Sequence, residues 1–351
     1  MPPPRKFVSA REVAERAGVS RSAVSRAFTP GASVSEDTRR RVLEAATALG
    51  YHVNHLARGL SLKESGIVCL VGSELGTPYR ASLVKAMTQA AQDAGKVAMV
   101  INTDRSDESV SAALRQALHY RADASIILSG MPDKSITRLC LENGQRIVLI
   151  NRDDDQDGPL RINLRDGEAA RCALTAFLRA GCRRLAFANS EAGTPSLMAR
   201  ERGFLAAAAA IGLPVTVERF GPSVYESGRE LARRLLTARV RPDAVFCATD
   251  LIACGFLDAA RHEFGLAVPE DLCVTGFDDI EQASWSSYSL TTFAQPVAEI
   301  AREAFAWLRL APEEAARRPA AVELEARMVW RRTVRGRPPA ARAAARAAVE
   351  A

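Results

Sequence analysis

The first fifty residues contain three stretches in which apolar side chains recur every three or four positions. Residues 10–17, 21–28 and 36–49 follow this period, which is typical of amphipathic helices. Each stretch follows a serine suited to cap a helix, and these serines are Ser9, Ser20 and Ser35. The sequence therefore predicts three short helices that pack into one small unit.

From residue 66 onward the pattern changes to short apolar runs that alternate with helical stretches. This alternation predicts parallel sheets with helices on both faces. Two blocks, 66–160 and 161–290, are expected to form two subdomains, and the last strand is expected over 321–332. The predicted buried strands are GIVCLVG at 66–72, VAMVIN at 97–102, ASIILSG at 124–130, RIVLIN at 146–151, RLAFANS at 184–190, AVFCATD at 244–250 and LCVTGF at 272–277.

The second predicted helix separates its side chains into two arcs on a helical wheel. The apolar arc can pack on the other two helices, so the polar arc faces outwards. Arginine can donate two hydrogen bonds to a guanine edge, and serine can donate to phosphates, which together suit a DNA groove. A solvated basic face is the alternative, and the tight turn before this capped helix makes it the weaker one. The polar arc holds Arg21, Ser22, Ser25 and Arg26, and the apolar arc holds Ala23, Val24, Ala27 and Phe28.

Charge is spread unevenly along the 351 residues. Residues 1–60 hold ten basic and five acidic side chains, and residues 331–351 hold six arginines against Glu350. Each end therefore carries +5, and residues 61–330 carry −4 of the net +6. Basic ends and a mildly acidic middle predict a polyanionic partner for the ends only.

Several protein classes are not expected. No apolar leader precedes the first helix and no run is long enough to cross a bilayer, so we expect a cytoplasmic protein without membrane contact. His52 and His55 have no further metal ligands nearby in the sequence, and we expect neither a metal nor a cofactor. Dinucleotide, P-loop, serine-hydrolase and zinc-protease motifs are missing, so an enzyme is not expected.

Residues 8–60 resemble the DNA-binding head of the lactose repressor/galactose repressor (LacI/GalR) family of bacterial transcriptional regulators. The shared motifs are VAERAGVS, VSR, VSEDTR, LGY and N-x-L-A-R-x-L in the head, and ESGRELARRLL, RPDAVFCATDLIACG, VPEDLCVTGFDDI and LTTFAQP further on. The resemblance implies an all-α helix-turn-helix head plus an α/β effector domain of two subdomains, similar to type I periplasmic binding proteins. The implied parts are a DNA-binding domain at 1–52, a hinge helix and linker at 53–65, an effector and dimerisation domain at 66–332, and a disordered basic tail at 333–351. Within the effector domain, the first subdomain is expected to hold 66–160 and 291–320, and the second 161–290 and 321–332.

The resemblance also assigns roles in the head. By position, the base-reading residues are Arg21, Ser22 and Arg26, and the phosphate-contacting residues are Ser20, Ser25 and Thr38. The hinge residues that enter the minor groove are Asn54, Ala57, Arg58 and Leu60, with Leu60 as the wedge that kinks the DNA. This sequence departs from the family pattern of the hinge at two positions. Val53 replaces a usual proline, and Gly59 weakens a helix.

A ligand site is expected where the strands of the second region end. Loops at the carboxyl ends of parallel strands converge on a crevice, and the candidates there are Asn151, Arg152, Asp250 and Asp278. The resemblance adds Tyr79 and Arg200. Two alternatives stay open, because Asp250 can serve as an N-cap and Asp278 can hold its own turn. Asn151 replaces an acidic residue of many relatives and Arg152 adds a positive charge, which favours a ligand with a carboxylate or phosphate over a neutral sugar.

The sequence thus predicts a DNA-binding transcriptional repressor whose operator affinity is switched by a small metabolite. One recognition helix covers few base pairs, so we expect a homodimer on a palindromic operator. The leucine heptad that makes some relatives tetrameric is missing from 338–351. The alternative is a solute-binding or sensor protein with the same core fold, against which the head and the missing signal peptide argue.

Overall fold

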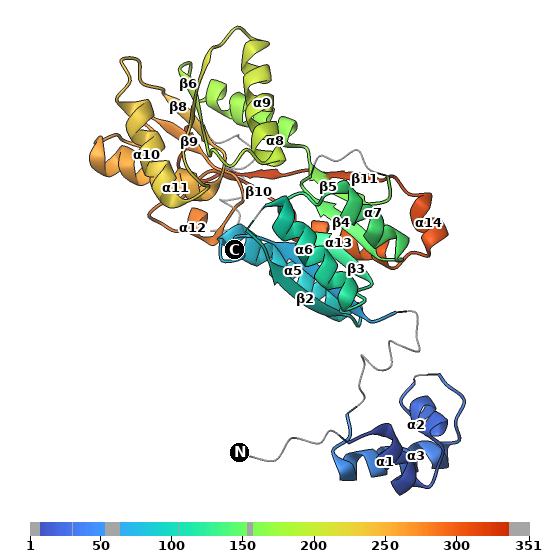
Figure 1. Cartoon of the computed structure of the whole chain (residues 1–351). Helices are drawn as coiled ribbons and strands as arrows, with labels where there is room; N and C mark the ends of the chain where they lie inside the picture. The colour runs from blue at the N-terminus through green and yellow to red at the C-terminus, as the bar shows by residue number, and fades with distance from the viewer. Residues whose placement is uncertain (1–7, 30, 53–63, 105, 153–156, 337–351) are drawn as a thin grey trace. The chain divides into compact units, whose positions relative to one another are not determined.

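The computed structural model describes residues 8–29, 31–52, 64–104, 106–152 and 157–336 (Figure 1). The chain divides into two compact units, Met1–Gly66 and Ile67–Ala351, which we call the head and the body. Among the described helices, none has the length and apolar character needed to cross a membrane.

The head contains the three predicted helices. They are α1 (Ala10–Ala17), α2 (Arg21–Ala27) and α3 (Glu36–Leu49). The hydroxyl of the preceding serine accepts a backbone N–H in each case, so Ser9, Ser20 and Ser35 are the N-caps. α1 and α3 end at glycines with a left-handed backbone, Gly18 and Gly50. Local signals in the sequence therefore determine where these helices begin and end.

One buried valine from each helix forms the centre of the head. Val13, Val24 and Val42 are at most 1% exposed and pack with small alanines. Two arginines of α3 fasten the other helices: Arg39 donates to the carbonyl of Ala27 at the end of α2, and Arg41 donates to the carbonyl of Ala17 at the end of α1. These two cations satisfy helix C-termini.

The body has two lobes, each built on a parallel sheet (Figure 1). The sheet of the first lobe has the strand order β2-β1-β3-β4-β5-β11. Its strands are β1 (Ile67–Gly72), β2 (Val97–Asn102), β3 (Ala124–Ile127), β4 (Arg146–Ile150), β5 (Leu160–Leu164) and β11 (Ala321–Leu324). Its helices are α5 (Pro78–Asp93), α6 (Asp107–His119), α7 (Lys134–Glu142), α13 (Val297–Leu308) and α14 (Pro312–Ala316).

Alternate residues of β1 explain why the first sheet is covered on both sides. Val68 and Leu70 belong to the cluster that includes Leu83 of α5 and Ile300 of α13. Cys69 and Val71 belong to a separate cluster with α6 and α7. A strand buried on both faces needs a continuous apolar run, which is the pattern seen in the sequence.

The second lobe repeats this plan with four parallel strands in the order β7-β6-β8-β9. The strands are β6 (Leu185–Asn189), β7 (Val215–Arg219), β8 (Ala244–Cys247) and β9 (Cys273–Thr275). The helical elements are α8 (Asp166–Arg179), α9 (Pro195–Ala209), α10 (Tyr225–Leu236), α11 (Asp250–Asp258), the π-helical turn η1 (Ala259–Glu263) and α12 (Glu281–Ser284).

The structure corrects three expected boundaries. Residues 160–164 and 321–324 belong to the first lobe as paired strands β5 and β11, although we expected 161–290 and 321–332 in the second. The expected strand 321–332 is divided, because β12 (Arg327–Val329) pairs with β10 (Thr292–Ala294) in a separate ladder. The expected tail begins later than residue 333, since Thr333 and Val334 are buried. Residues 337–351 lie outside the described residues.

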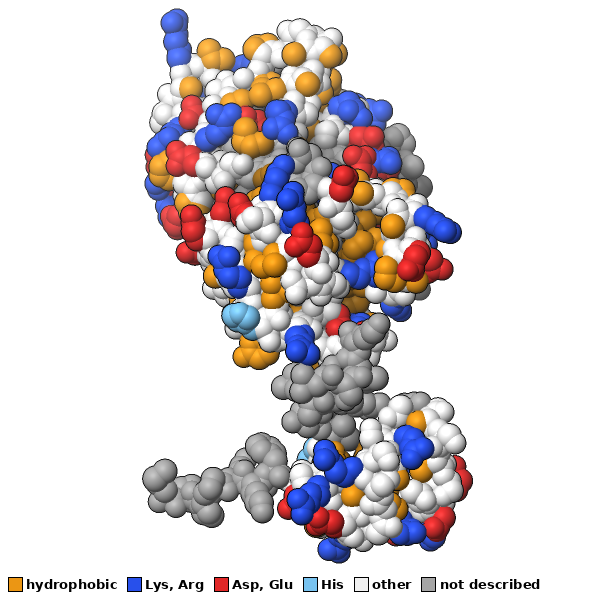
Figure 2. Space-filling view, turned by 45° about the vertical axis from the view of Figure 1, so that its right-hand side comes forward, with side chains coloured by type: hydrophobic (Ala, Val, Ile, Leu, Met, Phe, Trp, Pro, Cys, Tyr) orange, Lys and Arg blue, Asp and Glu red, His pale blue; other side chains and the backbone are white. Residues whose placement is uncertain are grey.

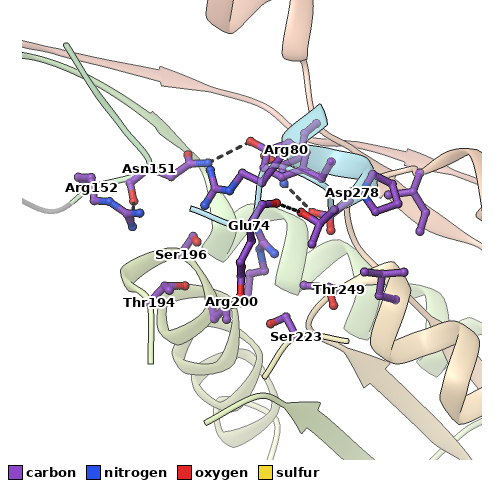
Figure 3. Close-up of a pocket in the computed structure, with 17 residues that line it drawn as sticks. Glu74, Arg80, Asn151, Arg152, Thr194, Ser196, Arg200, Ser223, Thr249 and Asp278 are labelled. Carbon is purple, nitrogen blue, oxygen red and sulfur yellow. Dashed lines mark hydrogen bonds between the residues drawn. The ribbon is translucent and has the colours of Figure 1, made fainter. Parts of the chain in front are cut away.

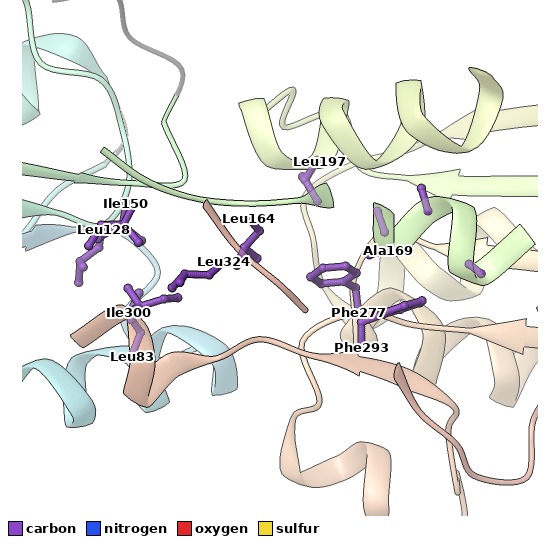
Figure 4. Packing of buried hydrophobic residues seen from close by; sticks show 14 of the residues in the cluster. Leu83, Leu128, Ile150, Leu164, Ala169, Leu197, Phe277, Phe293, Ile300 and Leu324 are labelled. Carbon is purple, nitrogen blue, oxygen red and sulfur yellow. The ribbon is translucent and has the colours of Figure 1, made fainter. Parts of the chain in front are cut away.

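Both lobes contribute to one apolar cluster. Leu324 of β11, Leu164 of β5 and Phe277 after β9 lie in it (Figure 4). The rings of Phe277 and Phe293 stack with centroids 5.5 Å apart. Because the chain passes between lobes after β5, after β9 and after β11, this cluster supports the hinge on which the lobes can move.

Candidate functional sites

The exposed face of α2 is the candidate DNA-reading surface of the head. Arg21, Ser22, Ser25 and Arg26 are exposed, while Val24 and Ala27 on the opposite side are buried. The side-chain arcs expected from the sequence are therefore confirmed. Figure 2 shows Arg and Lys side chains, in blue, on the visible surface of the head.

Some arginines of the head are paired with carboxylates. Arg11 pairs with Glu15 at 2.8 Å, and Arg40 pairs with Asp37 at 2.6 Å. Within the described part of the head, neither Arg21 nor Arg26 forms an ion pair with a carboxylate. Arg26 donates its Nε–H to the carbonyl of Ser22 at 3.4 Å. Both α2 guanidinium groups are on the exposed face, as recognition of base edges requires.

Two of the three expected phosphate contacts, Ser20 and Thr38, lie at helix N-termini, and the third, Ser25, is exposed further along α2. Ser20 caps α2, and its hydroxyl lies 2.8 Å from that of Ser22. Thr38 lies in the first turn of α3 and accepts a hydrogen bond from Ser35. Helix N-termini favour anions, so both places suit a DNA backbone. The expected hinge residues Asn54, Ala57, Arg58 and Leu60 lie outside the described residues.

A polar pocket lies between the two lobes of the body (Figure 3). It spans about 670 Å³, including the part that is open to solvent. Its walls come from loops after β1, β4, β6, β8 and β9, as expected for the carboxyl ends of parallel strands. The lining residues that sequence reasoning anticipated are Tyr79, Asn151, Arg152, Arg200 and Asp278.

On the wall of the first lobe, Asn151 links two elements. Its amide donates to the hydroxyl of Tyr79 at 3.4 Å, and its buried carbonyl oxygen has no hydrogen-bond partner among the described residues. Arg152 is 4% exposed, and its backbone N–H is bonded to Asn163 of β5. Burial raises the pKa of Tyr79 to about 12, so its phenol stays protonated at neutral pH.

On the wall of the second lobe, Arg200 of α9 is 2% exposed and held from three sides. Its Nε donates to Asp166 at 2.7 Å and its Nη1 to the carbonyl of Ala248 at 2.9 Å. Its Cζ lies 3.5 Å from the ring centroid of Phe277. These contacts fix the guanidinium in a single position at the edge of the pocket.

Asp278 enters the pocket from the loop after β9. One carboxylate oxygen accepts a hydrogen bond of 2.6 Å from Gln295. Burial raises the pKa of Asp278 to about 6, and Arg200 acts in the opposite direction. The carboxylate can accept hydrogen bonds from ligand hydroxyls when it is ionised.

Asp250 requires a correction, because it does not line the pocket. It is fully buried, and its carboxylate accepts from the backbone N–H of Ile280 at 3.0 Å and from the hydroxyl of Thr292. Thr249, one residue earlier, is the N-cap of α11. Asp250 therefore holds the loop that carries Asp278, and it does so from behind the pocket.

Several residues that line the pocket have positive backbone φ angles. Glu74, Asn151 and Asp278 line the pocket with φ values of 54°, 53° and 124°, in the region that residues other than glycine rarely adopt. Such conformations cost energy and persist where the surrounding structure imposes them, which is common at binding sites. This signal is independent of the side-chain chemistry.

Sequence reasoning missed several lining residues. Arg80 follows Tyr79 in α5, Thr194 and Ser196 lie at the start of α9, and Ser223 and Gln295 come from other loops. The rule that selected Asn151 applies equally to the loops after β1 and β6, so it could have found Arg80 and Ser196. Gln295 follows β10, whose position depends on pairing with β12.

Comparison with known proteins agrees with this architecture. The profile of bacterial regulatory proteins of the lacI family matches residues 9–54, and that of a periplasmic binding protein-like domain matches residues 174–334. The HTH-type transcriptional repressor PurR of Yersinia pestis bv. Antiqua is 28% identical over 330 residues, covering 92% of this chain and 96% of that protein.

Solved structures show the same fold over nearly the whole chain. A lac repressor dimer bound to operator and the anti-inducer ONPF has a TM-score of 0.85 at 25% identity, covering 93% of this chain and 99% of that one. A LacI-family regulator from Silicibacter pomeroyi has a TM-score of 0.79 at 26% identity, with the same coverage. The regulator CelR in complex with cellobiose has a TM-score of 0.68 at 26% identity, again over 93% and 99%.

The head and the two-lobed body together define a helix-turn-helix regulatory protein with a periplasmic-binding-protein-like domain. The chain belongs to the lactose repressor/galactose repressor family.

Proposed function

We propose that this protein is a transcriptional repressor that binds a palindromic operator and changes its operator affinity when a small metabolite binds between the lobes. One observation carries the proposal. The same chain contains a capped recognition helix and a polar pocket between two lobes. The helix presents Arg21 and Arg26, which have no carboxylate partner in the described head. The repressors and operator complex among its relatives support the same function.

In the head, Arg21, Ser22 and Arg26 are the proposed base-reading residues. An arginine fork matches the two acceptors of guanine in the major groove. Ser20, Ser25 and Thr38 are proposed to bind phosphates, which position the head without reading sequence. Asn54, Ala57, Arg58 and Leu60 are proposed to enter the central minor groove, where insertion of Leu60 kinks the DNA.

In the body, Tyr79, Asn151, Arg152, Arg200 and Asp278 are the proposed effector ligands, while Asp250 supports the Asp278 loop. Because these residues come from both lobes, one ligand that contacts both walls stabilises the closed arrangement. Closure changes the operator affinity only if the two lobe arrangements bind DNA differently. The effector therefore acts through a difference in affinity between two states.

A second copy of the chain is the proposed partner of the first lobe. β2 is the edge strand of the six-stranded sheet, and Val97 and Val100 are 67% and 42% exposed there. An exposed apolar edge strand is a site for pairing with another chain. A two-fold dimer also provides the two heads that a palindrome requires.

The test is selection of genomic fragments by the purified full-length protein at about 150 mM salt, where unspecific phosphate binding is weak. We expect an enriched palindrome with a flexible central step, and a sedimentation mass of two chains. The Arg21→Ala variant should fail to enrich the same sequence. Equal recovery of all fragments by the wild type, with and without cell-extract metabolites, would contradict a repressor and favour a sensor that does not regulate DNA.

A further inference from the structure

Six of the seven free cysteines lie in neighbouring pairs inside the body. The seventh, Cys172, is exposed on α8. Buried thiols in apolar surroundings are normally inert, so a pair with different surroundings marks a place where sulfur chemistry can occur. The pairs are Cys69 with Cys140, Cys247 with Cys254, and Cys182 with Cys273.

Two of the three pairs have only apolar surroundings. Cys69 of β1 and Cys140 of α7 belong to the cluster that covers one face of the first sheet. Cys247 at the end of β8 and Cys254 of α11 belong to a cluster of the second lobe. Burial raises the pKa of all four thiols. These cysteines therefore stay protonated and act as small apolar side chains.

The third pair lies at the amino-terminal edge of the second sheet. Cys182 precedes β6, and Cys273 is the first residue of β9. Asp243, just before the intervening strand β8, connects them through its backbone. Its carbonyl accepts the S–H of Cys182 at 3.4 Å and the N–H of Cys273 at 2.9 Å. The two thiols are within hydrogen-bonding distance of one another.

Arg335 supplies a cation to this pair. Its Nη2 donates to the sulfur of Cys182 at 3.2 Å, and its backbone N–H donates to the sulfur of Cys273. Its Nε donates to the carbonyl of Ala180 at 3.1 Å and its Nη1 to that of Pro269 at 2.9 Å, so the guanidinium is held in place. Among the described residues, no carboxylate forms an ion pair with Arg335.

These contacts favour a thiolate at one of the two sulfur atoms. The hydrogen bond from Cys182 and the donors of Arg335 lower the pKa of Cys273, against the effects of burial and of the Asp243 carboxylate. The same hydrogen bond, together with burial, raises the pKa of Cys182. The pair therefore loses its first proton more readily than an ordinary thiol. A thiolate beside a second thiol can be oxidised and then attacked by its neighbour.

Residues 331–335 connect the cysteine pair with the loop that enters the effector pocket. Val274 of β9 donates its N–H to the carbonyl of Thr333 at 2.8 Å, and the hydroxyl of Thr333 donates to the carbonyl of Val274 at 2.7 Å. At the other end of this segment, Arg331 donates to the carboxylate of Asp279 at 2.6 Å. A change at the thiols can therefore reach the pocket loop through this segment.

From this arrangement we infer that Cys182 and Cys273 form a redox-active dithiol. A hydroperoxide oxidises the pair to a disulfide, and oxidation weakens the attachment of residues 331–335 to the second lobe. A disulfide carries no negative charge, so Arg335 loses its charge-assisted hydrogen bonds to sulfur. Both cysteines are buried and Arg335 is half-buried, so a small hydroperoxide reaches the sulfur atoms through local opening at Arg335.

The reaction takes two steps. The Cys273 thiolate attacks the outer oxygen of the hydroperoxide, the O–O bond breaks, and the leaving alkoxide or hydroxide takes up the proton that the thiol released. Cys273 is then a sulfenic acid. The sulfur of Cys182 attacks the sulfur of Cys273, the S–O bond breaks, and hydroxide leaves as water with the Cys182 proton. The two thiols lose two electrons, and the hydroperoxide gains them.

The test is differential alkylation and mass spectrometry on the full-length protein treated with hydrogen peroxide. After catalase has removed the peroxide, the protein is unfolded in guanidinium chloride with N-ethylmaleimide, so that buried thiols also react. We expect Cys182 and Cys273 to be lost together as one linked pair and to return after reduction with dithiothreitol. Cys69→Ala and Cys247→Ala each change one apolar pair. They are the matched controls and should lose the same two thiols.

Two variants separate the attacking sulfur from the resolving one. Cys182→Ala should stop the reaction at the sulfenic acid of Cys273, which dimedone traps. Cys273→Ala should leave Cys182 reduced under the same treatment. Circular dichroism of each variant checks that it is folded.

Hydrogen exchange measures the effect of oxidation on the fold. The Val274 amide is bonded to Thr333, so its exchange rate reports the attachment of residues 331–335. We expect this amide to exchange at least about tenfold faster in the oxidised protein, while the amides of β1 in the first lobe are unchanged.

Four results would overturn the inference. They are oxidation confined to Cys172, a disulfide within either apolar pair, full alkylation of Cys182 and Cys273 under conditions that oxidise free cysteine in the same tube, and equal exchange at Val274 in both redox states. None of these measurements involves operator binding, so they test the dithiol independently of the repressor function.

Discussion

The head and the body present their functional side chains in opposite ways. In the head, Arg21 and Arg26 are exposed and stand apart from the ion pairs of the same unit. In the body, Arg200 is 2% exposed and bound to Asp166, a carbonyl and an aromatic face. DNA is a large partner that reaches an open surface, whereas a small ligand must be enclosed. In the body the same residues therefore stabilise the fold and face the ligand, whereas in the head different residues do so.

The two units also differ in how they treat helix N-termini. Ser9, Ser20 and Ser35 accept backbone N–H groups of the head helices. At the pocket, Thr77 and Thr194 leave the corresponding groups of α5 and α9 without a side-chain partner. The head uses its caps for stability, and the body leaves helix ends available for a ligand.

Removing the buried cation of the body should have the greatest cost in stability. Arg200→Ala leaves the buried Asp166 without its cation, so we expect the free energy of unfolding of the body to fall by about 3–5 kcal/mol. Urea unfolding followed by circular dichroism measures the loss. Arg302→Ala is the control, because the Arg302 side chain is 62% exposed and its ion pairs contribute little.

A double variant tests whether the lost stability comes from the unpaired charge of Asp166. Asp166→Asn combined with Arg200→Met removes both charges, and we expect it to recover part of the stability while ligand binding stays lost. A loss below about 1 kcal/mol for Arg200→Ala would show that water reaches Asp166 and that this wall of the pocket resembles the head after all.

The sequence predicts those features of the fold that depend on residues close together along the chain. The head helices and their exposed arc come from caps and periodicity within a few residues, so the sequence located them closely. Most body strands followed from continuous apolar runs, but β5 reads LRINL and β7 reads VTVER, and the polar residues within these two strands hid them. The local hydrophobic pattern does not show where the chain passes from one lobe to the other. Residues 321–324 were therefore assigned to the wrong lobe.

Local sequence patterns also predicted only part of the pocket lining. The strand-end rule found Asn151, Arg152 and Asp278, because parallel strands bring their carboxyl ends to one edge. It also selected Asp250, which is equally close to a strand end. Only the packing of Thr292 and Ile280 against that carboxylate shows that it lies behind the pocket. Arg80 lies in the segment that follows β1, where the same rule applies, and it was missed because the rule was not applied to that strand end.

The second prediction concerns the head. Arg21→Ala or Arg26→Ala should weaken binding to the cognate operator by about 1–3 kcal/mol and relax the preference at one base pair per half-site. Fluorescence anisotropy with operator variants measures both effects. Arg11→Ala removes an arginine already paired with Glu15 and is the matched control. Equal weakening on all sequences would mean that Arg21 or Arg26 contacts phosphate.

The third prediction uses the buried carboxylates of the body. Burial and, to a smaller extent, the nearby Asp278 carboxylate raise the pKa of Asp250 to about 8. A carboxyl whose folded pKa is raised contributes stability that is complete below about pH 4 and is lost as the pH rises through about 8. We therefore expect the body to lose stability between pH 6 and about 8, by at most about 1.4 kcal/mol per pH unit for one proton.

Asp250→Asn isolates this contribution, since the amide keeps the shape of the side chain and does not titrate. Thermal unfolding across the same pH range should give a flatter profile for the variant. Identical slopes for variant and wild type would mean that Asp250 is ionised in the folded body and that its two hydrogen bonds stabilise the charge.

The smallest effect tests the treatment of helix ends directly. Ser35→Ala removes the hydroxyl that accepts the N–H of Thr38, and we expect it to destabilise α3 by about 1 kcal/mol. Thr194→Ala occupies the equivalent position of α9 but removes no such bond, so the stability of the body should change by less than about 0.5 kcal/mol. Hydrogen exchange of α3 and α9 amides in the full-length protein measures both. If Thr194→Ala speeds exchange in α9 as much as Ser35→Ala does in α3, the α9 terminus is capped in solution and is not held open for a ligand. If only the α3 amides respond, the helix ends of the two units serve different purposes.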